Sequence, residues 1–235
     1  GITEGGALTV DIAGDWYIVE SAFVGPNQPM GSSKFSAIPS DTAGNWRIRV
    51  SEVSESRVEL SAEGAGYSIV RTIAVRGGRL EVSDQVTNTS AADIAIGIQH
   101  DYLGSDRSPR ILLAGAPQDL EGDIAQTAKN WVKKILRSIG MRAPSVISHT
   151  AENPTFYLTQ ARSTLGLVLE DTLSRLKSEM VDKTDHSTIS IQPVALEAGQ
   201  QRSFNWSLYP SSSEGDYFEF INRVRRDWDV NFTIH

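Results

Sequence analysis

The segment from Tyr67 to Gly104 constrains the fold of this 235-residue chain more than any other part of it. Apolar and polar residues alternate there in three successive runs, and the breaks at residues 76–78 and 88–90 contain glycine, asparagine and serine. A period of two residues with such breaks is typical of half-buried antiparallel strands joined by tight turns. The segment therefore predicts a three-stranded meander, whose apolar face needs a second layer, usually another sheet, to cover it.

Shorter alternating runs on both sides of the meander predict further strands. They lie at residues 7–12, 16–19, 46–50, 58–60, 155–158, 165–169, 173–181, 188–196 and 203–209. Between Gln118 and Gly140, apolar residues recur at helical spacing, and a second helical stripe follows Ser213. The sequence therefore predicts a mainly all-β fold, a large antiparallel β-supersandwich with one inserted helix and one C-terminal helix.

The expected domain organisation is one sandwich followed by a junction. We expect residues 1–212 to form the sandwich, and residues 213–235 to form a helix and the start of a linker or strand. Val230, Phe232 and Ile234 alternate as in the first residues of a strand. We therefore expect the chain to be a segment of a longer protein whose next domain follows this helix.

The composition argues against several kinds of partner. The formal net charge of −7 disfavours a nucleic-acid-binding surface, which normally has a basic excess. No apolar run is long enough to predict a membrane span. The absence of cysteine excludes disulfides and thiolate zinc sites but leaves the compartment open, and a secreted or periplasmic location would suit work on polysaccharides. No metal-ligand spacing or cofactor fingerprint is present, so we expect neither a metal nor a cofactor.

His100 is the main candidate for a catalytic or ligand-binding side chain. It continues the alternating face of the strand predicted from Ile94 onward, and Asp101 follows it directly. An imidazole at such a position can act as a general acid or base, or can bind a ligand. Because adjacent strand residues point to opposite faces, Asp101 is poorly placed to orient His100. The structural alternative is a hydrogen-bonded histidine at the edge of the core.

Two tryptophans are candidates for stacking on a sugar ring. Trp16 and Trp46 both lie near polar turns, which favours exposure of their rings. Trp206 alternates with Phe204 and Leu208 and is expected in the core. The candidate ligand-binding residues are therefore His100, Asp101, Trp16 and Trp46.

The strand that ends in the sequence V-x-N-x-S resembles the galactose mutarotase-like superfamily. In that superfamily such a strand, here with Val86, Asn88 and Ser90, is followed by another that delivers a histidine, as His100 does here. The later sequence VALEAGQQRSFNWSLYP is similar to the late strand pair of the same superfamily. The resemblance spans about residues 7–210. It implies large packed antiparallel sheets in a sugar-related context.

The resemblance also implies catalysis by two histidines and a late glutamate that follows a Pro-Gly turn. His100 matches the first histidine, but no histidine stands at the expected distance for the second. At the late turn the chain has Ala198-Gly199-Gln200, so an amide stands where the base belongs. The C-terminal sequence is similar to the junction between a β-sandwich and a catalytic barrel in multidomain glycoside-hydrolase-like proteins.

Three functions are consistent with these features. The one we favour is a non-catalytic accessory domain of a larger carbohydrate-active protein, such as a glycoside hydrolase, which packs on the following catalytic domain and shapes its glycan cleft. The second is an aldose epimerase or a related mutarotase-like enzyme that uses His100. The third is a purely structural domain between other domains.

Overall fold

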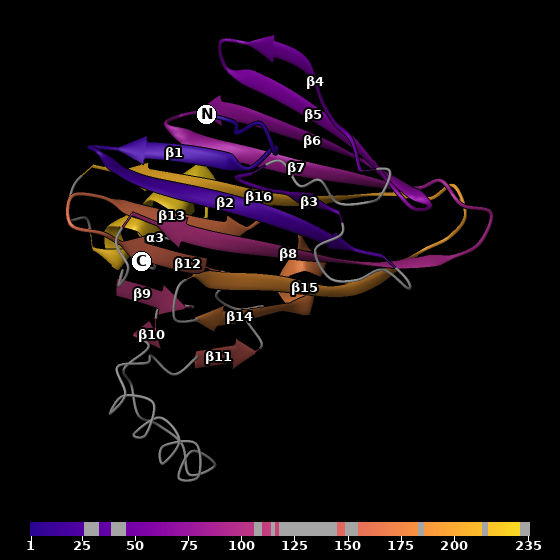
Figure 1. Ribbon diagram of the computed structural model, residues 1–235. Coiled ribbons are helices and arrows are strands. Elements are labelled where there is room, and N and C mark those ends of the chain that lie inside the picture. The colour runs from indigo at the N-terminus through magenta and orange to yellow at the C-terminus, as the bar shows by residue number, and fades with distance from the viewer. Residues whose placement is uncertain are drawn as a thin grey trace, which may run out of the picture.

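The computed structural model describes residues 1–25, 33–38, 46–105, 110–113, 116–117, 145–148, 155–182, 186–212 and 216–230 (Figure 1). Within these ranges, antiparallel strands form a seven-stranded and a nine-stranded sheet, and only two helices are present. The prediction of a mainly β protein with large antiparallel sheets is thus confirmed. None of the described helices is long and apolar enough to cross a membrane.

The seven-stranded sheet has the order β1-β2-β8-β15-β14-β11, and β3 pairs with β2 outside this path. Its central pairing joins segments that lie far apart in the sequence, because β8 lies between β2 and β15. The strands are β1 (Leu8–Ile12), β2 (Asp15–Val24), β3 (Lys34–Phe35), β8 (Ile94–Gly104), β11 (Ser145–Ser148), β14 (Ser178–Asp182) and β15 (Ser187–Leu196).

The nine-stranded sheet has the order β10-β9-β12-β13-β16-β7-β6-β5-β4. The chain returns from the C-terminal half to place β16 beside β7. The strands are β4 (Ile48–Ser54), β5 (Arg57–Gly64), β6 (Tyr67–Arg76), β7 (Arg79–Asn88), β9 (Arg110–Leu113), β10 (Ala116–Pro117), β12 (Thr155–Thr159), β13 (Thr164–Leu169) and β16 (Gln201–Ser211).

The predicted three-stranded meander is correct in its strands and wrong in its pairing. β6 and β7 pair in the nine-stranded sheet, whereas β8 belongs to the other sheet. The break after Asn88 therefore carries the chain across the sandwich rather than around a hairpin. Alternation specifies which residues of a strand face the core, but the choice of a partner strand depends on contacts distant in sequence.

The Asn88 side chain holds this crossing in place. Its Nδ2 donates to the backbone carbonyls of Ala92, Leu196 and Glu197, at 2.8, 3.0 and 3.0 Å. Its Oδ1 accepts from the backbone N–H of Ser90 at 2.9 Å. One buried amide thus joins the crossing segment to the end of β15. The V-x-N-x-S sequence has a clear structural role in this protein.

The core lies between the two sheets, and both contribute large side chains to it. Trp206 is 1% exposed, in agreement with the expectation for its alternating strand. The other large, fully buried apolar side chains are Tyr17, Phe23, Phe35, Leu60, Tyr67, Ile69, Ile96, Ile98, Phe156 and Phe204.

The run at residues 173–181, expected to be one strand, is divided. Its first part forms the helix α2 (Thr172–Lys177), and only its second part forms β14. Asp171 caps α2 by accepting from the backbone N–H of Ser174 at 2.8 Å and from its Oγ at 2.6 Å. The first N–H groups of a helix have no partner within the helix, and an N-cap aspartate accepts a hydrogen bond from one of them. This stabilises a helix at residues 172–177 in spite of their weak alternating pattern.

The C-terminal helix is present as α3 (Tyr217–Asp227) and begins after the N-cap residue Asp216. It packs on the outer face of the nine-stranded sheet, where Figure 1 shows it behind β12 and β13. Gly166 on β13 makes this contact close, because a Cβ atom there would lie 2.3 Å from the ring of Phe220. The predicted helix at 118–140 and the predicted strand after Val230 lie outside the described residues.

Candidate functional site

His100 lies in the middle of the core and is 0% exposed. Its Nδ1 is within hydrogen-bonding distance of the Ser21 Oγ on β2, at 2.9 Å, and its ring centroid is 4.7 Å from that of Trp206. Burial lowers the pKa of His100 to about 4, because desolvation disfavours the imidazolium. The ring is therefore neutral near pH 7.

An ion pair between Arg71 and Asp84 faces His100 from the nine-stranded sheet, and both of its side chains are 0% exposed. The Arg71 Nε and Nη2 donate to the two carboxylate oxygens at 2.6 and 2.9 Å, and Trp206 Nε1 donates to the same carboxylate at 3.0 Å. Burial alone would raise the pKa of Asp84, but the charge and hydrogen bonds of Arg71 hold it below its usual value.

This buried pair was not predicted from the sequence, although a signal for it was present. Arg71 stands between Ile69 and Ile73 on β6, and Asp84 stands between Val82 and Val86 on β7. Each charge therefore occupies an inward position of an alternating strand. Because charged residues are almost never fully buried unless paired, two such positions indicate a buried ion pair.

The side chains of Ser21, His100 and Asp84 are the types used in nucleophilic catalysis, but the core encloses them. Their exposed fractions are 1%, 0% and 0%. A substrate could reach the serine hydroxyl only if the two sheets separated. This group is therefore a polar centre of the core rather than a site open to a ligand.

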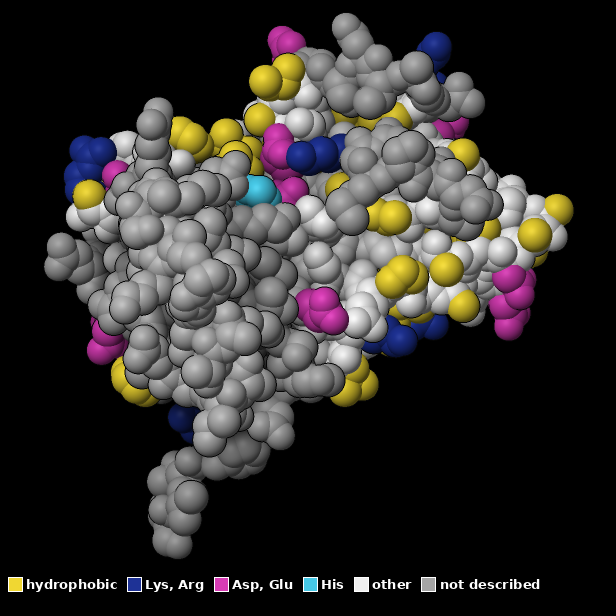
Figure 2. Space-filling view, turned by 60° about the horizontal axis from the view of Figure 1, so that its bottom comes forward, with side chains coloured by type: hydrophobic (Ala, Val, Ile, Leu, Met, Phe, Trp, Pro, Cys, Tyr) yellow, Lys and Arg dark blue, Asp and Glu magenta, His cyan; other side chains and the backbone are white. Residues whose placement is uncertain are grey.

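A second polar group lies on the outer face of the seven-stranded sheet. Glu20 on β2 is directly opposite Asp101 on β8, so their side chains are neighbours on one face. Lys34 on β3 forms an ion pair with Glu20 and lies 4.0 Å from Asp101, and His186 Nε2 lies 3.8 Å from the same aspartate. We call Glu20, Lys34, Asp101 and His186 the outer-face cluster. Figure 2 shows a histidine beside acidic and basic side chains on this surface.

Hydrogen bonds fix both carboxylates of the outer-face cluster. Asp101 accepts from Thr188 Oγ1 at 2.8 Å and from Gln99 Nε2 at 2.9 and 3.1 Å. Glu20 accepts from the backbone N–H of Ala37 at 2.8 Å. Burial alone would raise the pKa of Glu20, but this bond and the Lys34 ammonium hold it below its usual value. The Glu20 carboxylate is therefore an ionised, oriented hydrogen-bond acceptor near pH 7.

Trp16 lies on the same face as the outer-face cluster. It is 45% exposed and precedes Glu20 by four residues on β2, an even spacing that places both side chains on one side of the sheet. At about 3.3 Å per residue, the two positions are roughly 13 Å apart along the strand. The surface between them joins an exposed aromatic ring to charged hydrogen-bonding groups.

Trp46 was expected to be exposed, but it is partly buried and packs against the core. Its ring packs against Phe23 and Phe35, with centroid distances of 6.0 and 5.4 Å. Its Nε1–H donates to the backbone carbonyl of Lys34 at 2.9 Å. Trp46 therefore anchors β3 and so helps to position the Lys34 side chain.

Gln200, the amide at the late turn, lies far from His100. Its Oε1 accepts from the backbone N–H of Glu197 at 3.0 Å, within a turn in which Gly199 has a φ of +75°. His100 pairs with Ile189, which is seven residues, or roughly 23 Å, from the end of β15 at Leu196.

In the described part of the chain, no three histidine or acidic side chains are grouped as metal ligands.

No family model matches the sequence, and no curated protein matches it. Solved structures with similar folds include the Slr1438 protein from Synechocystis sp. PCC 6803, at 8% identity over 72% of this chain and 66% of that chain, with a TM-score of 0.47. Another is a galactose mutarotase-like protein from Lactobacillus casei ATCC 334, at 11% identity over 88% of this chain and 100% of that chain, with a TM-score of 0.47.

A GH36 alpha-galactosidase from Geobacillus stearothermophilus is also similar, at 8% identity over 82% of this chain and 30% of that chain, with a TM-score of 0.46. The structures with similar folds thus include a galactose mutarotase-like protein, as the sequence resemblance indicated. Because these TM-scores are below 0.5, the likenesses establish neither membership of a family nor an activity. The fold defines this protein as a mainly β antiparallel sandwich.

Proposed function

We propose that this chain is a non-catalytic, carbohydrate-associated domain that contacts a glycan through the outer face of its seven-stranded sheet. The observation that carries this proposal is the placement of Trp16 and the outer-face cluster on one side of β2 and β8. A half-exposed indole offers an apolar surface with a polar edge. The carboxylates of Glu20 and Asp101 are charge-assisted acceptors for hydroxyl groups, and Lys34 is a donor.

The protonation states of Glu20 and His100 support binding rather than catalysis. General acid catalysis near neutral pH needs a group that still holds a proton there, such as a carboxyl with a raised pKa. The pKa of Glu20 is lowered instead, and the neutral His100 is enclosed in the core. Glu20 and Asp101 are also neighbours on one sheet face, whereas glycosidase carboxyls flank the scissile bond.

The same proposal places the domain in a larger carbohydrate-active protein, beside a catalytic domain that follows residue 235. The similarity of the C-terminal sequence to a sandwich–barrel junction supports this arrangement. Phe218 on α3 also supports it, because 72% of this large apolar side chain is exposed where the expected junction begins.

The test is glycan binding by the purified chain, first on an array of oligosaccharides and then by titration calorimetry with the best ligand. We expect Trp16→Ala to weaken binding roughly two- to tenfold, the range for one aromatic contact. We expect Asp101→Asn to weaken it roughly tenfold or more, because a charge-assisted hydrogen bond is lost. Phe218→Ala removes an exposed ring elsewhere and should leave the affinity unchanged.

Failure of every oligosaccharide to bind would refute the proposal, as would binding that does not depend on Trp16 and Asp101. Anomer interconversion is measured on the same samples by NMR, and we expect no acceleration above the uncatalysed rate. An acceleration that His100→Gln abolishes would instead establish the epimerase alternative.

A further inference from the structure

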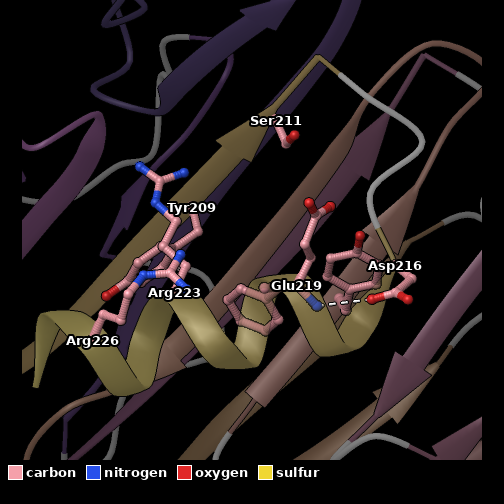
Figure 3. Close-up of a pocket in the computed structure, with 8 residues that line it drawn as sticks. Tyr209, Ser211, Asp216, Glu219, Arg223 and Arg226 are labelled. Atoms are coloured by element: carbon pink, nitrogen blue, oxygen red, sulfur yellow. Dashed lines mark hydrogen bonds between the residues drawn. The ribbon is translucent and has the colours of Figure 1, made fainter. Parts of the chain in front are cut away.

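A separate pocket of about 200 Å³ lies between α3 and the outer face of the nine-stranded sheet (Figure 3). It is on the other side of the sandwich from the outer-face cluster, since the two sites lie on the outer faces of different sheets. The residues that give it its chemical character are Tyr157, Tyr209, Glu219, Phe220, Arg223 and Arg226.

Aromatic rings form one wall of this pocket. Phe220 stacks on Tyr157 with a centroid distance of 5.4 Å and an interplanar angle of 22°. It also contacts Tyr209 edge to face at 5.6 Å. All three rings are buried, and Gly166 lets Phe220 approach the sheet closely. The wall is therefore formed before any ligand arrives.

Two arginines that form no ion pair with a described carboxylate line the same pocket. Arg223 and Arg226 are three residues apart on α3 and so share one side of the helix. Arg223 donates to the backbone carbonyls of Gly77 and Pro210, at 2.9 and 3.4 Å, and its guanidinium lies 5.3 Å from the Tyr209 ring centroid. Carbonyl oxygens accept its hydrogen bonds without cancelling its charge.

A neighbouring arginine, Arg79, differs from these two because carboxylates pair with it. Arg79 also lies beside Tyr209, but it forms ion pairs with Asp227 at 2.6 Å and with Glu81 at 2.7 Å. Among the described residues, no carboxylate forms an ion pair with Arg223 or Arg226. With respect to this part of the chain, the two guanidinium groups can still pair with an anion.

Glu219 supplies an acceptor at the other end of the pocket. It precedes Arg223 by four residues, a spacing at which a helix normally allows an ion pair, but Arg223 is directed to the Gly77 and Pro210 carbonyls instead. The backbone positions of Glu219 and Arg223 are about 6 Å apart along the helix axis. Figure 3 shows Glu219 and Asp216 at one end and Arg223, Arg226 and Tyr209 at the other.

We propose that this pocket binds one ring of a sugar acid, that is, a pyranose that bears a carboxylate. The planar guanidinium groups of Arg223 and Arg226 would receive the carboxylate, Glu219 would accept from ring hydroxyls, and the aromatic wall would contact the apolar ring atoms. The pocket is smaller than the roughly 300–1,000 Å³ of sites for drug-sized ligands, which suits a single ring. This site is independent of the glycan contact proposed for the outer-face cluster.

The test is a titration of the full chain with glucuronate, and with glucose as the uncharged counterpart, followed by calorimetry or ligand-observed NMR. We expect glucuronate to bind at least tenfold more tightly than glucose, because only glucuronate has a carboxylate that can accept a charge-assisted hydrogen bond from the arginines. Arg226→Gln should weaken glucuronate binding about tenfold or more. Arg225→Gln is the matched control, because Arg225 is an exposed neighbour on α3 that does not line the pocket.

Several results would overturn this proposal. One is equal loss of affinity in Arg225→Gln and Arg226→Gln, which would indicate attraction by general charge. Another is the absence of glucuronate binding at millimolar concentrations, or tighter binding of an amino acid such as glycine. A third is binding that Trp16→Ala abolishes and Arg226→Gln does not change, which would assign the sugar acid to the outer face and leave the proposed function intact.

Discussion

The buried ion pair between Arg71 and Asp84 allows a quantitative prediction about stability. Substitution of Asp84 by alanine removes a carboxylate that accepts three hydrogen bonds, at 2.6, 2.9 and 3.0 Å, two of them from Arg71 and one from Trp206. The guanidinium would remain charged, because arginine does not lose its proton in proteins. With 0% of the Arg71 side chain exposed, water cannot replace the lost partner without disruption of the core.

Removal of one partner from a buried ion pair costs about 3–5 kcal/mol. A domain is stable by only about 5–15 kcal/mol, so Asp84→Ala should remove a large part of the free energy of unfolding. The double variant Arg71→Met, Asp84→Leu eliminates both charges and keeps apolar contact with Phe35, which lies 4.7 Å from the guanidinium. We expect it to be more stable than Asp84→Ala, and within about 2 kcal/mol of the wild type.

Urea unfolding, followed by tryptophan fluorescence and far-UV circular dichroism, measures these differences by linear extrapolation. Comparison of both single variants with the double variant gives the coupling energy of the pair. If Asp84→Ala does not fold, Asp84→Asn offers a milder change that retains an oxygen for the Trp206 indole. A cost of less than about 1 kcal/mol for loss of the carboxylate would contradict this prediction. A double variant that loses as much stability as the two single variants together would also contradict it.

Three further predictions concern the core and its connections. His100 has a pKa of about 4 in the folded protein and about 6.5 when unfolded, so the unfolded chain binds an extra proton between these values. Stability should therefore fall by roughly 2–3 kcal/mol as the pH drops from about 7 to about 4, and His100→Gln should reduce this slope in urea titrations; an unchanged slope would contradict it. Asn88→Ala removes bonds to three backbone carbonyls and should cost about 2–4 kcal/mol, whereas Thr89→Ala, at an exposed neighbour, should have little effect on the thermal midpoint. Gly166→Ala places a Cβ atom 2.3 Å from the Phe220 ring and should cost about 1–3 kcal/mol, with faster hydrogen exchange in α3; a second change, Phe220→Leu, should restore part of the loss.

The strands and the general fold class could be predicted from the sequence because alternation is a local property. The runs at 67–76, 79–88 and 94–104 are strands in the structure, and the helical stripe after residue 213 is α3. Each of these elements buries one face, and the periodicity of its own residues identifies that face. The same pattern marks Arg71 and Asp84 as inward-facing charges.

The pairing of the strands depends on contacts between segments that are distant in the sequence. β8 continues the meander in sequence but lies in the other sheet, next to β2 and β15. Trp16 and Asp101 share a face only because β2 and β8 are neighbours, although these residues are far apart in the chain. Contacts of this kind depend on which sheet edges meet, and no local pattern encodes that choice.

The environment of His100 likewise depends partly on its local sequence and partly on the packing of the two sheets. Its alternation with Ile96 and Ile98 predicts one face of a strand, and both an open cleft and a closed core are compatible with that face. The nine-stranded sheet covers it with Trp206 and the Arg71–Asp84 pair, which leaves no exposed surface. The local pattern of residues therefore specifies the strand and the side of it on which the histidine lies. Only the packing of the second sheet determined that this side is the interior, because burial is a property of two surfaces in contact.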